Sequence, residues 1–449
     1  MLAAMMAVFL MLAPTSQALG DIAKSVFAQG GTPGMAVAVV HNGQVVFSGG
    51  FGYADPASTK SATPDTRFAV GSLSKQFTAV SVLTLVQDGK LSLDDRLAKF
   101  FPKFPNASTI TIRQLLNQTS GLHNYPNTDE HAWPLSGAVD LDTILTTLAT
   151  DKPDFAPGEK YEYSNSNYTV LAAIVQQVSG APFGRFLEQR IFKPLGLSRS
   201  GYGYVMQRAG DLAVPYIGKN PAPLQISLDL YAGAGGVVST ANDMARWDEA
   251  LLRGSLLQVA QARLLWTPGR PQTGESSYAM GFVADTLDEQ PYVWHNGYTP
   301  YAGGYCFNAI FPQQHLAVIV LTNGGIDDEQ GKPETLVRRI FEAYVPPSPL
   351  HADAAITALA QKMLRGFQSG QVDRSVMTPG FAAYVTPAVL ARATAVWAPL
   401  GEARSFALTS TGESRGAMRY IYRVQFPGGI VKSVYLFVRD GKAAGFTMY

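Results

Sequence analysis

Cysteine is almost absent from this 449-residue chain, in which Cys306 is the only one. A single thiol excludes a disulfide framework and a metal site built from several thiolates. An excess of charge is missing too, because 35 basic residues stand against 34 acidic ones. This balance gives no indication of a nucleic acid or an anionic membrane surface as a partner. The six histidines lack the paired spacing of metal ligands, so we expect neither a metal nor a cofactor.

Long hydrophobic runs are missing as well. The N-terminal stretch MLAAMMAVFLMLAPTSQALG is apolar over roughly a dozen residues, too short for the ~20 that a membrane-spanning helix needs. Ser16 and Ala18 fit the small-residue pattern of a signal-peptidase site, so we predict a signal peptide over 1–18 and an exported protein, periplasmic or secreted. The alternative is a buried N-terminal helix, because no Lys or Arg precedes the apolar run. No cysteine follows that would carry a lipid, so we expect no stable membrane anchor after cleavage.

Hydrophobic periodicity and turn residues divide the chain into strands and helices. Two strands joined at Asn42-Gly43 are expected over 34–55, because Asn-Gly is a strong hairpin signal. The segment from Ser72 to about Asp88 has a helical pattern that is apolar on nearly every side, which is typical of a central helix. Further helices are expected at 167–180 and 333–345, and strands at 291–297, 303–311 and 315–323.

This order of elements predicts an α+β fold, in which one antiparallel sheet unites both ends of a domain over 19–345. Helices and an all-helical region would pack against that sheet. The proline-rich sequence PPSPLHA predicts a linker at 346–352. We expect 353–449 to form a smaller α+β domain that loosely resembles the nuclear-transport-factor-like group. It offers no catalytic or metal-ligating set, so packing, substrate restriction or association is its expected role.

The stretch GSLSKQF at 71–77 places a serine and a lysine three residues apart at the start of the predicted central helix. Residues with this helical spacing share a face, with Cβ atoms ~5–6 Å apart, so Ser72 and Lys75 can touch. A serine hydroxyl needs a neighbouring base to become a nucleophile, and burial lowers the pKa of a lysine enough for that task. The alternative is a chance match with an exposed lysine, since about one Ser-x-x-Lys is expected in such a chain.

Tyr163 and Asn165 lie in KYEYSNSNYTVL, ahead of the predicted 167–180 helix. A lysine ammonium lowers the pKa of a neighbouring phenol, so a tyrosinate at this position is expected to accept a proton. The Asn165 amide is suited to hold the lysine and a substrate amide or carbonyl oxygen through hydrogen bonds. The alternative is an ordinary half-buried tyrosine, with a residue from Ser164 to Asn167, such as Ser166 or Asn167, capping the helix.

His295 and Gly297 follow PYVW at the end of an expected strand. A donor side chain and a glycine there would form one wall of a cleft, and the glycine would let a substrate approach the backbone. The Tyr-x-Asn and His-Asn-Gly patterns each occur a second time in the chain. We interpret Tyr125-Pro126-Asn127 as turn chemistry, because no apolar helix follows its loop. The copy at 41–43 lies between two expected strands, where hairpin geometry explains it.

Three motifs stand in one order along the chain and resemble those of the penicillin-recognising serine hydrolases. The motifs are Ser72-x-x-Lys75, Tyr163-x-Asn165 and His295-x-Gly297. The Tyr-x-Asn form is similar to the branch with class C β-lactamases, penicillin-binding proteins, family VIII esterases, D-alanyl-D-alanine carboxypeptidases and D-aminopeptidases. Flanks such as ITIRQLLNQTSGL and AGAGGVVSTANDMARW extend the likeness over about 20–345. The resemblance implies a β-lactamase/transpeptidase-like domain.

The resemblance also implies catalytic roles. Ser72 would be the nucleophile, and Lys75 with Tyr163 would form the base pair. The reaction would be attack on an acyl carbonyl, formation of an acyl-enzyme and release by water. The expected partner is therefore a small-molecule or peptide substrate.

Substrate-binding roles follow from the same resemblance. Asn165 would contact the substrate, and His295 would line the cleft from a sheet edge. The backbone N–H groups of Ser72 and of Tyr298, directly after Gly297, would form the oxyanion hole.

Two positions depart from the family pattern. Class C β-lactamases usually have lysine where His295 stands, which argues against efficient β-lactam hydrolysis. Gln118 stands where relatives more often have histidine, and no mechanism for this exchange follows from the sequence. We expect a serine hydrolase acting on an ester or amide, with a D-Ala-directed carboxypeptidase, a D-aminopeptidase or a weak β-lactamase as alternatives. An alternative of another class is a non-catalytic homologue that binds peptidoglycan fragments or serves as a scaffold.

Overall fold

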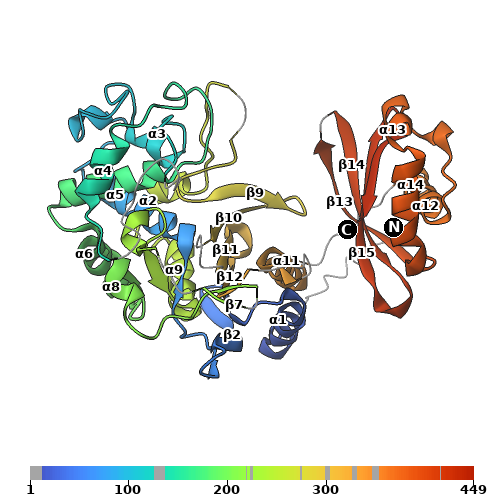
Figure 1. The fold of residues 1–449 in the computed structure, drawn as a ribbon, viewed down its shortest axis with the longest axis horizontal. Coiled ribbons are helices and arrows are strands. Elements are labelled where there is room, and N and C mark those ends of the chain that lie inside the picture. Colours follow the sequence, from blue (N-terminus) through green and yellow to red (C-terminus); the bar gives the residue numbers. More distant parts are fainter. Residues whose placement is uncertain are drawn as a thin grey trace, which may run out of the picture. The chain divides into compact units, whose positions relative to one another are not determined.

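The computed structural model describes residues 13–448, apart from 126–136, 219, 223–225, 274–275, 299–303, 326–330, 346–352 and 415. The chain divides into two compact units, Met1–Tyr344 and Val345–Tyr449 (Figure 1). The predicted linker at 346–352 and most of the predicted signal peptide lie outside the described residues. Within the described ranges, no helix combines the length and the apolar character that crossing a membrane requires.

The first unit is built on a seven-stranded antiparallel sheet whose middle strands come from opposite ends of the unit. β1 pairs with β12 from Met35↔Thr322 to His41↔Leu316. The order across the sheet is β3-β2-β1-β12-β11-β10-β9. The strands are β1 Gly34–His41, β2 Gln44–Asp55, β3 Lys60–Ser61, β9 Val283–Leu287, β10 Gln290–Tyr298, β11 Tyr305–Phe311 and β12 Leu316–Thr322. The prediction that one sheet unites both ends of this region is confirmed.

Helices cover this sheet, which explains why its middle strands are uninterrupted apolar runs. Every residue of β12 is buried, as is every residue of β1 except His41. α9 (Ala241–Arg253) packs against β1 and β12. α1 (Ser16–Gly30) and α11 (Pro333–Tyr344) lie side by side and contact β2 and β12, respectively (Figure 1). A strand with an apolar side chain at every position is stable only where packing removes both of its faces from water.

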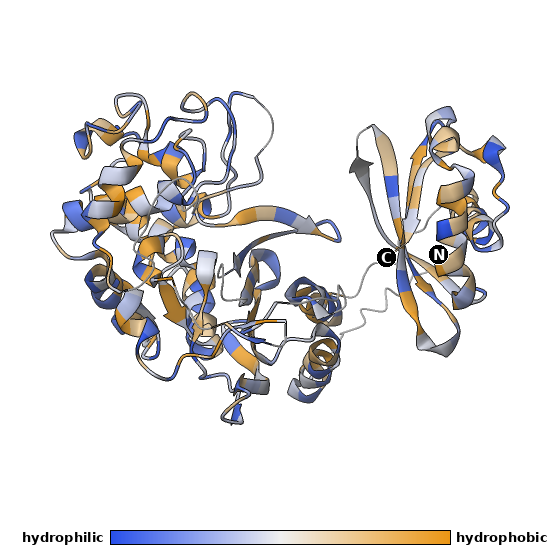
Figure 2. Ribbon diagram, viewed as in Figure 1, coloured by the Kyte–Doolittle hydropathy of each residue, from blue (hydrophilic) through white to orange (hydrophobic). Residues whose placement is uncertain are grey.

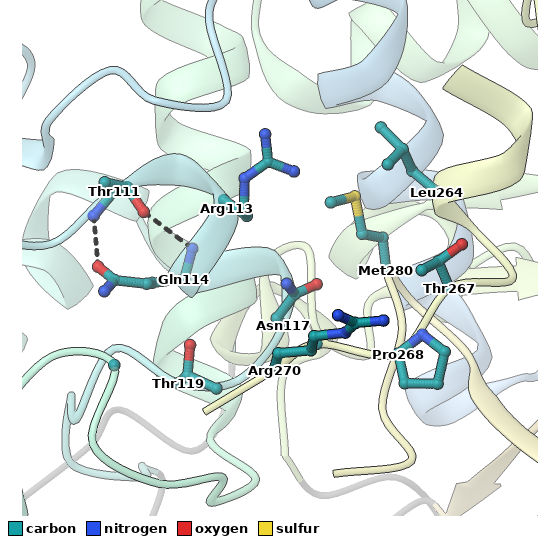
Figure 3. A pocket seen from close by; sticks show the side chains of 12 residues that line it. Thr111, Arg113, Gln114, Asn117, Thr119, Leu264, Thr267, Pro268, Arg270 and Met280 are labelled. Atoms are coloured by element: carbon teal, nitrogen blue, oxygen red, sulfur yellow. Dashed lines mark hydrogen bonds between the residues drawn. The ribbon is translucent and has the colours of Figure 1, made fainter. Parts of the chain in front are cut away.

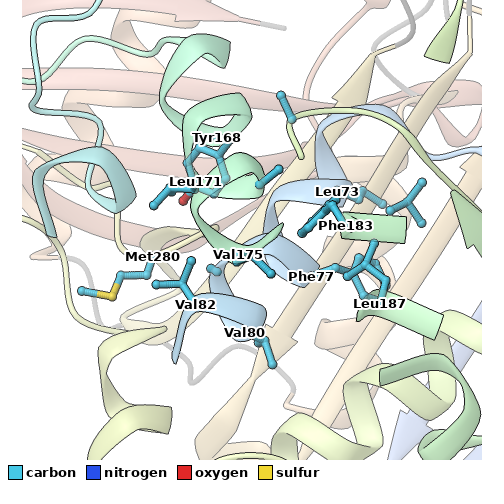
Figure 4. Close-up of a cluster of buried hydrophobic side chains, with 14 of the residues drawn as sticks. Leu73, Phe77, Val80, Val82, Tyr168, Leu171, Val175, Phe183, Leu187 and Met280 are labelled. Carbon is cyan, nitrogen blue, oxygen red and sulfur yellow. The ribbon is translucent and has the colours of Figure 1, made fainter. Parts of the chain in front are cut away.

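The predicted central helix is α2 (Ser74–Gln87), which is buried at every residue from Ser74 to Leu85. It packs against α5 (Asn165–Ser179), and Figure 4 shows Phe77, Val80 and Val82 together with Leu171 and Val175. Gly89, just after the helix, adopts φ +69°, a conformation that favours glycine and ends helices. Smaller helices surround this pair: α3 Ile112–Leu116, α4 Leu141–Leu148, α6 Phe183–Leu187, α7 Lys193–Leu195, α8 Gly203–Gln207 and α10 Val259–Leu264.

Short strands join the helical region to the rest of the first unit. β8 lies between β4 and β5, while β6 and β7 form a separate pair. Their bounds are β4 Phe68–Ala69, β5 Gly201–Tyr202, β6 Tyr216–Ile217, β7 Asn220–Pro221 and β8 Val237–Ser239. β4 leads directly into the turn that carries Ser72, so its pairing with β8 anchors the start of α2.

The second unit is a four-stranded antiparallel meander with helices, in the predicted order. Its elements are α12 Ala354–Ser369, α13 Pro379–Tyr384, α14 Pro387–Trp397, β13 Ser405–Ser414, β14 Ala417–Gln425, β15 Val431–Arg439 and β16 Lys442–Met448. Its strands carry both hydrophobic and hydrophilic residues (Figure 2), buried and more exposed positions alternate along much of β15, and the buried set includes Phe367, Val434 and Phe446. Along β13, the alternation of apolar residues is limited to Phe406 and Leu408. A single apolar face against helices explains the alternation in the other strands.

Candidate active site

Ser72 lies in a 3₁₀ turn, Gly71–Leu73, that leads from β4 into α2. The hydroxyl of Ser74 secures this turn, because it donates to Gly71 O at 2.7 Å and accepts from Val237 N at 2.9 Å. Gly71 adopts φ +55°, a conformation that favours glycine. The turn therefore holds Ser72 at the partly exposed start of an otherwise buried helix.

Lys75 is completely buried, one turn along from Ser72. Its Nζ lies 3.0 Å from Ser72 Oγ, and it donates to Asn165 Oδ1 and Ala234 O at 2.8 Å each. Burial lowers the pKa of this lysine well below its usual value. A neutral lysine amine has two N–H groups, which donate to Asn165 Oδ1 and Ala234 O. Its lone pair is then left to face the hydroxyl of Ser72. The predicted contact between Ser72 and Lys75 is present, and the surroundings favour an uncharged amine.

Tyr163 brings its phenol to the same hydroxyl, with Tyr163 OH 2.9 Å from Ser72 Oγ. Burial raises the pKa of Tyr163 above its usual value, although the hydrogen bond with Ser72 opposes this shift. The expected tyrosinate is therefore wrong at neutral pH. The pair Tyr163 and Lys75 can hold the same protons in two ways, as phenolate with ammonium or as phenol with neutral amine. Burial favours the second, uncharged state, because removing two charges from water is costly.

Asn165 is the first residue of α5, so this helix begins two residues earlier than predicted. Its side-chain oxygen accepts from Lys75, while its Nδ2 donates to Asn124 Oδ1 at 3.2 Å and to Tyr125 O at 3.3 Å. All of these contacts lie within the protein, so Asn165 orients the lysine amine. Its predicted contact with a substrate stays a prediction.

Gln118 holds the loop that carries Tyr163. It is completely buried, it has φ +61°, and its Oε1 accepts from Ser164 N at 3.1 Å and from Asn167 Nδ2 at 2.6 Å. Its backbone carbonyl accepts from Glu162 N at 3.1 Å. The expectation that Asn167 caps the helix is wrong, because that side chain binds Gln118. The structure thus gives Gln118 the positioning role that sequence reasoning did not find.

The expectation that Ser166 caps α5 is also wrong, because its hydroxyl makes other contacts. Ser164 occupies the N-cap position of α5 without a side-chain capping bond. The hydroxyl of Ser166 instead donates to His123 O and accepts from Tyr125 N. The side chains at the start of α5 therefore bind the segment 118–125 instead of capping their own helix.

His295 lies on β10 and is 2% exposed. Its Nδ1 is 2.6 Å from Asn296 O and must donate there, so the neutral ring accepts at Nε2 from Tyr278 OH, 3.2 Å away. Burial lowers the pKa of His295 to about 3. The ring centroids of His295 and Tyr163 are 6.2 Å apart. The site therefore contains a neutral imidazole. Sequence reasoning did not predict its partner Tyr278, because the surrounding stretch SSYAMGF contains no recognisable motif.

The end of β10 presents a free edge to the Ser72 turn. β9 pairs only with Gln290 to Trp294, so the following residues pair with β11 alone. This observation agrees with the prediction that His295 lies at a sheet edge. Residues 299–303, which follow the strand, lie outside the described residues.

Gly297 is explained by close packing between this edge and the Ser72 turn. A Cβ on Gly297 would lie 1.9 Å from Val70 O and 3.3 Å from Ser72 N. A Cβ on Gly71 would lie 3.0 Å from Tyr298 N. The predicted reason for the glycine was incomplete, because the backbone that approaches Gly297 belongs to this protein. The amides of Ser72 and Tyr298 consequently lie at one narrow contact.

In the second His-Asn-Gly and Tyr-x-Asn sequences, the described side chains lie outside the site around Ser72. His41-Asn42-Gly43 forms the hairpin turn between β1 and β2, as predicted. Tyr125 is 1% exposed, and its hydroxyl donates to Leu230 O at 2.6 Å and lies beside Thr169. The turn interpretation of Tyr125 is therefore wrong for the side chain, which belongs to the core, and Asn127 lies outside the described residues. Among the described residues, no group of three or more His, Cys, Asp or Glu could hold a metal ion.

Sequence comparison relates the chain to proteins of known families. Residues 16–341 match the family described as Beta-lactamase. PbpX of Bacillus subtilis (strain 168), a relative named for penicillin binding, is 34% identical over 247 residues, which cover 54% of this chain and 60% of PbpX. Protein flp of Staphylococcus aureus (strain COL) is 27% identical over 322 residues, which cover 69% of this chain and 63% of flp. The chain thus spans less than two thirds of either relative.

Solved structures share the fold. The octameric penicillin-binding protein homologue from Pyrococcus abyssi has a TM-score of 0.64 at 18% identity, and the match covers 96% of this chain and 98% of that chain. D-amino acid amidase from Ochrobactrum anthropi SV3 has a TM-score of 0.64 at 24% identity, covering 73% of this chain and 98% of that chain. At these identities the two likenesses concern the fold alone.

Proposed function

The chain belongs to the beta-lactamase family, and from this membership we propose that it is a serine hydrolase that forms an acyl-enzyme on Ser72. The observation that carries the proposal is the set of contacts around one hydroxyl. Ser72 Oγ lies 3.0 Å from Lys75 Nζ and 2.9 Å from Tyr163 OH. A nucleophile with a base in hydrogen-bond reach, and a third group orienting the base, is the arrangement that nucleophilic catalysis requires.

In the proposed acylation, Ser72 Oγ attacks the carbonyl carbon of an ester or amide while its proton passes to the Lys75 amine. The bond to the leaving oxygen or nitrogen then breaks, and the leaving group takes a proton from the Tyr163 phenol. Lys75 returns its extra proton to that phenolate, which restores the uncharged pair. Water then attacks the acyl-enzyme, and the same groups carry its proton to Ser72. Proton transfer of this kind contributes typically ~10²–10⁴ in rate.

The carbonyl oxygen becomes negative during the attack, and we assign its stabilisation to the backbone N–H groups of Ser72 and Tyr298. The close approach of β10 to the Ser72 turn supports this assignment. In that approach, Ser72 N is 3.3 Å from the position of a Cβ on Gly297. One oxyanion donor is typically worth ~10²–10³ in rate.

The charge state of the site favours substrates without a carboxylate beside the scissile bond. His295 is neutral because its pKa is about 3, and burial keeps Lys75 uncharged. Apart from Lys75, no described Lys or Arg forms a hydrogen bond with Ser72, Tyr163 or His295. Esters and uncharged amides fit this site better than β-lactams or peptides that end in a D-Ala carboxylate. The fold shared with D-amino acid amidase makes D-amino acid amides the second candidate substrates.

Intact-protein mass spectrometry tests the nucleophile. We expect a fluorophosphonate probe to add one adduct to the native protein and none to Ser72→Ala, whose fold circular dichroism would show to be unchanged. Ser81→Ala is the matched control, because Ser81 is a buried residue of α2 whose hydroxyl donates to Phe77 O, within the helix itself. Turnover of p-nitrophenyl acetate, D-phenylalanine amide, a D-Ala-D-Ala peptide and nitrocefin then ranks the substrates. Ester and amide turnover should exceed the other two.

Two results of the labelling experiment would contradict the proposal. An adduct that persists in Ser72→Ala places the nucleophile elsewhere. No adduct on correctly folded protein, with either the fluorophosphonate or penicillin, favours a non-catalytic homologue that binds peptidoglycan fragments or serves as a scaffold.

Export is the second part of the proposal. Thr15 caps α1, which begins at Ser16. Cleavage after Ala18 would therefore remove the first turn of this helix and leave the buried Leu19 near the new N-terminus. N-terminal sequencing of the protein recovered outside the cytoplasm tests the cleavage site, and a sequence that still begins at Met1 would contradict it.

A further inference from the structure

A cavity of about 420 Å³ opens beside α3 (Figure 3). None of Ser72, Lys75, Tyr163, Asn165 and His295 lines it. We propose that this cavity is a second binding site for a small organic anion that also carries a hydroxyl or N–H donor. The proposal is independent of the reaction assigned to Ser72.

Two arginines give the cavity its preference for an anion. Arg113 and Arg270 both line it. Arg113 pairs with Asp94 at 3.6 Å, but Asp94 is 80% exposed, and exposed pairs of this kind are weak. No described acidic side chain forms an ion pair with Arg270. A guanidinium presents a fixed fork of donors that matches a carboxylate or phosphate.

Asn117 supplies the second, independent observation. Its Oδ1 is shielded from solvent and has no hydrogen-bond partner among the described residues. Figure 3 shows the Asn117 side chain between Arg113 and Arg270. A shielded acceptor without a partner costs free energy that a ligand donor would recover. A ligand with a hydroxyl or N–H group near its anionic end satisfies both requirements.

Apolar side chains complete the opposite wall. Leu264, Pro268 and Met280 line the cavity beside Arg270. A volume of about 420 Å³ is in the range of small-molecule sites, which combine apolar walls with a few polar groups. The ligand that fits best is therefore a small hydroxy acid or acylamino acid with a compact apolar body.

Neighbouring side chains of one turn face the cavity and the residues that follow Tyr163. Asn117 and Thr119 line the cavity. Gln118, between them, directs its side chain the other way, to Ser164 and Asn167. A ligand in this cavity is consequently separated from the reacting groups by the turn itself. Acylation of Ser72 should leave its binding unchanged.

Fluorine NMR of 4-fluoromandelate tests the site, since this hydroxy acid contains no bond that a hydrolase can cleave. We expect saturable line broadening with the native full chain, and none with the neutral 1-(4-fluorophenyl)ethane-1,2-diol. Arg113→Ala/Arg270→Ala should weaken binding at least tenfold, and Asn117→Leu severalfold. Arg263→Ala is the matched control, because Arg263 is an exposed arginine of α10 outside the lining.

The binding measurements distinguish a real second site from its absence. Binding that falls in both cavity variants, is unchanged in Arg263→Ala and survives fluorophosphonate labelling supports the proposal. Absence of saturable binding, equal binding by the double variant, or loss of binding on labelling would overturn it. If the double variant fails to fold, Arg270→Ala alone is informative, because Arg270 is exposed and its removal breaks no described ion pair.

Discussion

His-Asn-Gly occurs at 41–43 and again at 295–297, and the two copies need their glycine for different reasons. In the first copy the chain reverses, with φ +50° at Asn42 and +72° at Gly43. In the second copy the chain runs on within β10, and a Cβ on Gly297 would lie 1.9 Å from Val70 O. One glycine is required for a backbone torsion, and the other because no space remains for a side chain. The same letters therefore acquire different roles through packing.

The two histidines differ in the same way. His41 is partly exposed and its ring lies 4.4 Å from that of Tyr344. His295 is buried against Tyr163 and Tyr278. Burial lowers the pKa of both imidazoles, and that of His295 falls to about 3. Only the second histidine is forced to stay neutral by its surroundings at the pH where enzymes usually work.

The largest difference should come from replacing the two glycines. Gly297→Ala must push the Ser72 turn away, and displacing both the nucleophile and an oxyanion donor should lower kcat/KM for p-nitrophenyl acetate by ~10³. Gly43→Ala should cost about 1 kcal/mol in urea unfolding, because alanine is strained at positive φ, and leave activity within about twofold. Equal activity losses in the two variants would remove the distinction.

The two tyrosines of the Tyr-x-Asn patterns give the next largest effect. Tyr163→Phe removes the phenol beside Ser72 and should lower kcat by ~10² with little change in stability. Tyr125→Phe leaves Thr169 and Leu230 O without their partner, so it should cost about 1–3 kcal/mol of unfolding free energy. Its kcat should be nearly unchanged. A Tyr125→Phe protein that is folded but inactive, beside an active Tyr163→Phe, would mean that we chose the wrong tyrosine.

The two histidines should differ in acid sensitivity. Folding lowers the pKa of His295 to about 3, so below pH 6.5 the unfolded chain binds a proton that the folded protein does not. Stability is therefore lost as the pH falls, by about 2 kcal/mol between pH 6.5 and pH 5. His295→Gln should remove this loss, as measured by urea unfolding at both pH values. His41→Gln should change the pH dependence much less, and an equal change would contradict the difference in burial.

The smallest effect should come from the contact that holds the Tyr163 loop. Gln118→Ala removes the acceptor for Ser164 N and Asn167 Nδ2, so kcat should fall roughly tenfold while KM changes little. Gln118→Glu keeps an acceptor oxygen and should retain more activity than the alanine variant. A purely structural role would instead lower the unfolding free energy of both variants and leave kcat of the folded protein unchanged.

Local patterns along the chain predicted most of the fold. Asn42-Gly43 placed the first hairpin, and the apolar run after Ser72 placed the central helix. The three late strands were equally visible, because each combines apolar residues with a turn signal. The contact between Ser72 and Lys75 was also predictable, since helical geometry alone brings residues three apart together.

Tertiary packing decided the ionisation states and the supporting contacts of the site. Tyr163 is a phenol rather than a phenolate because burial raises its pKa more than the hydrogen bond with Ser72 lowers it, and this burial comes from segments distant in sequence. Gln118 binds residues 46 and 49 positions away, and Tyr278 reaches His295 across 17 positions. Spacing along the chain determines which groups can meet within one helix or hairpin. The solvent and the partners around each group depend on chain segments that only folding brings together.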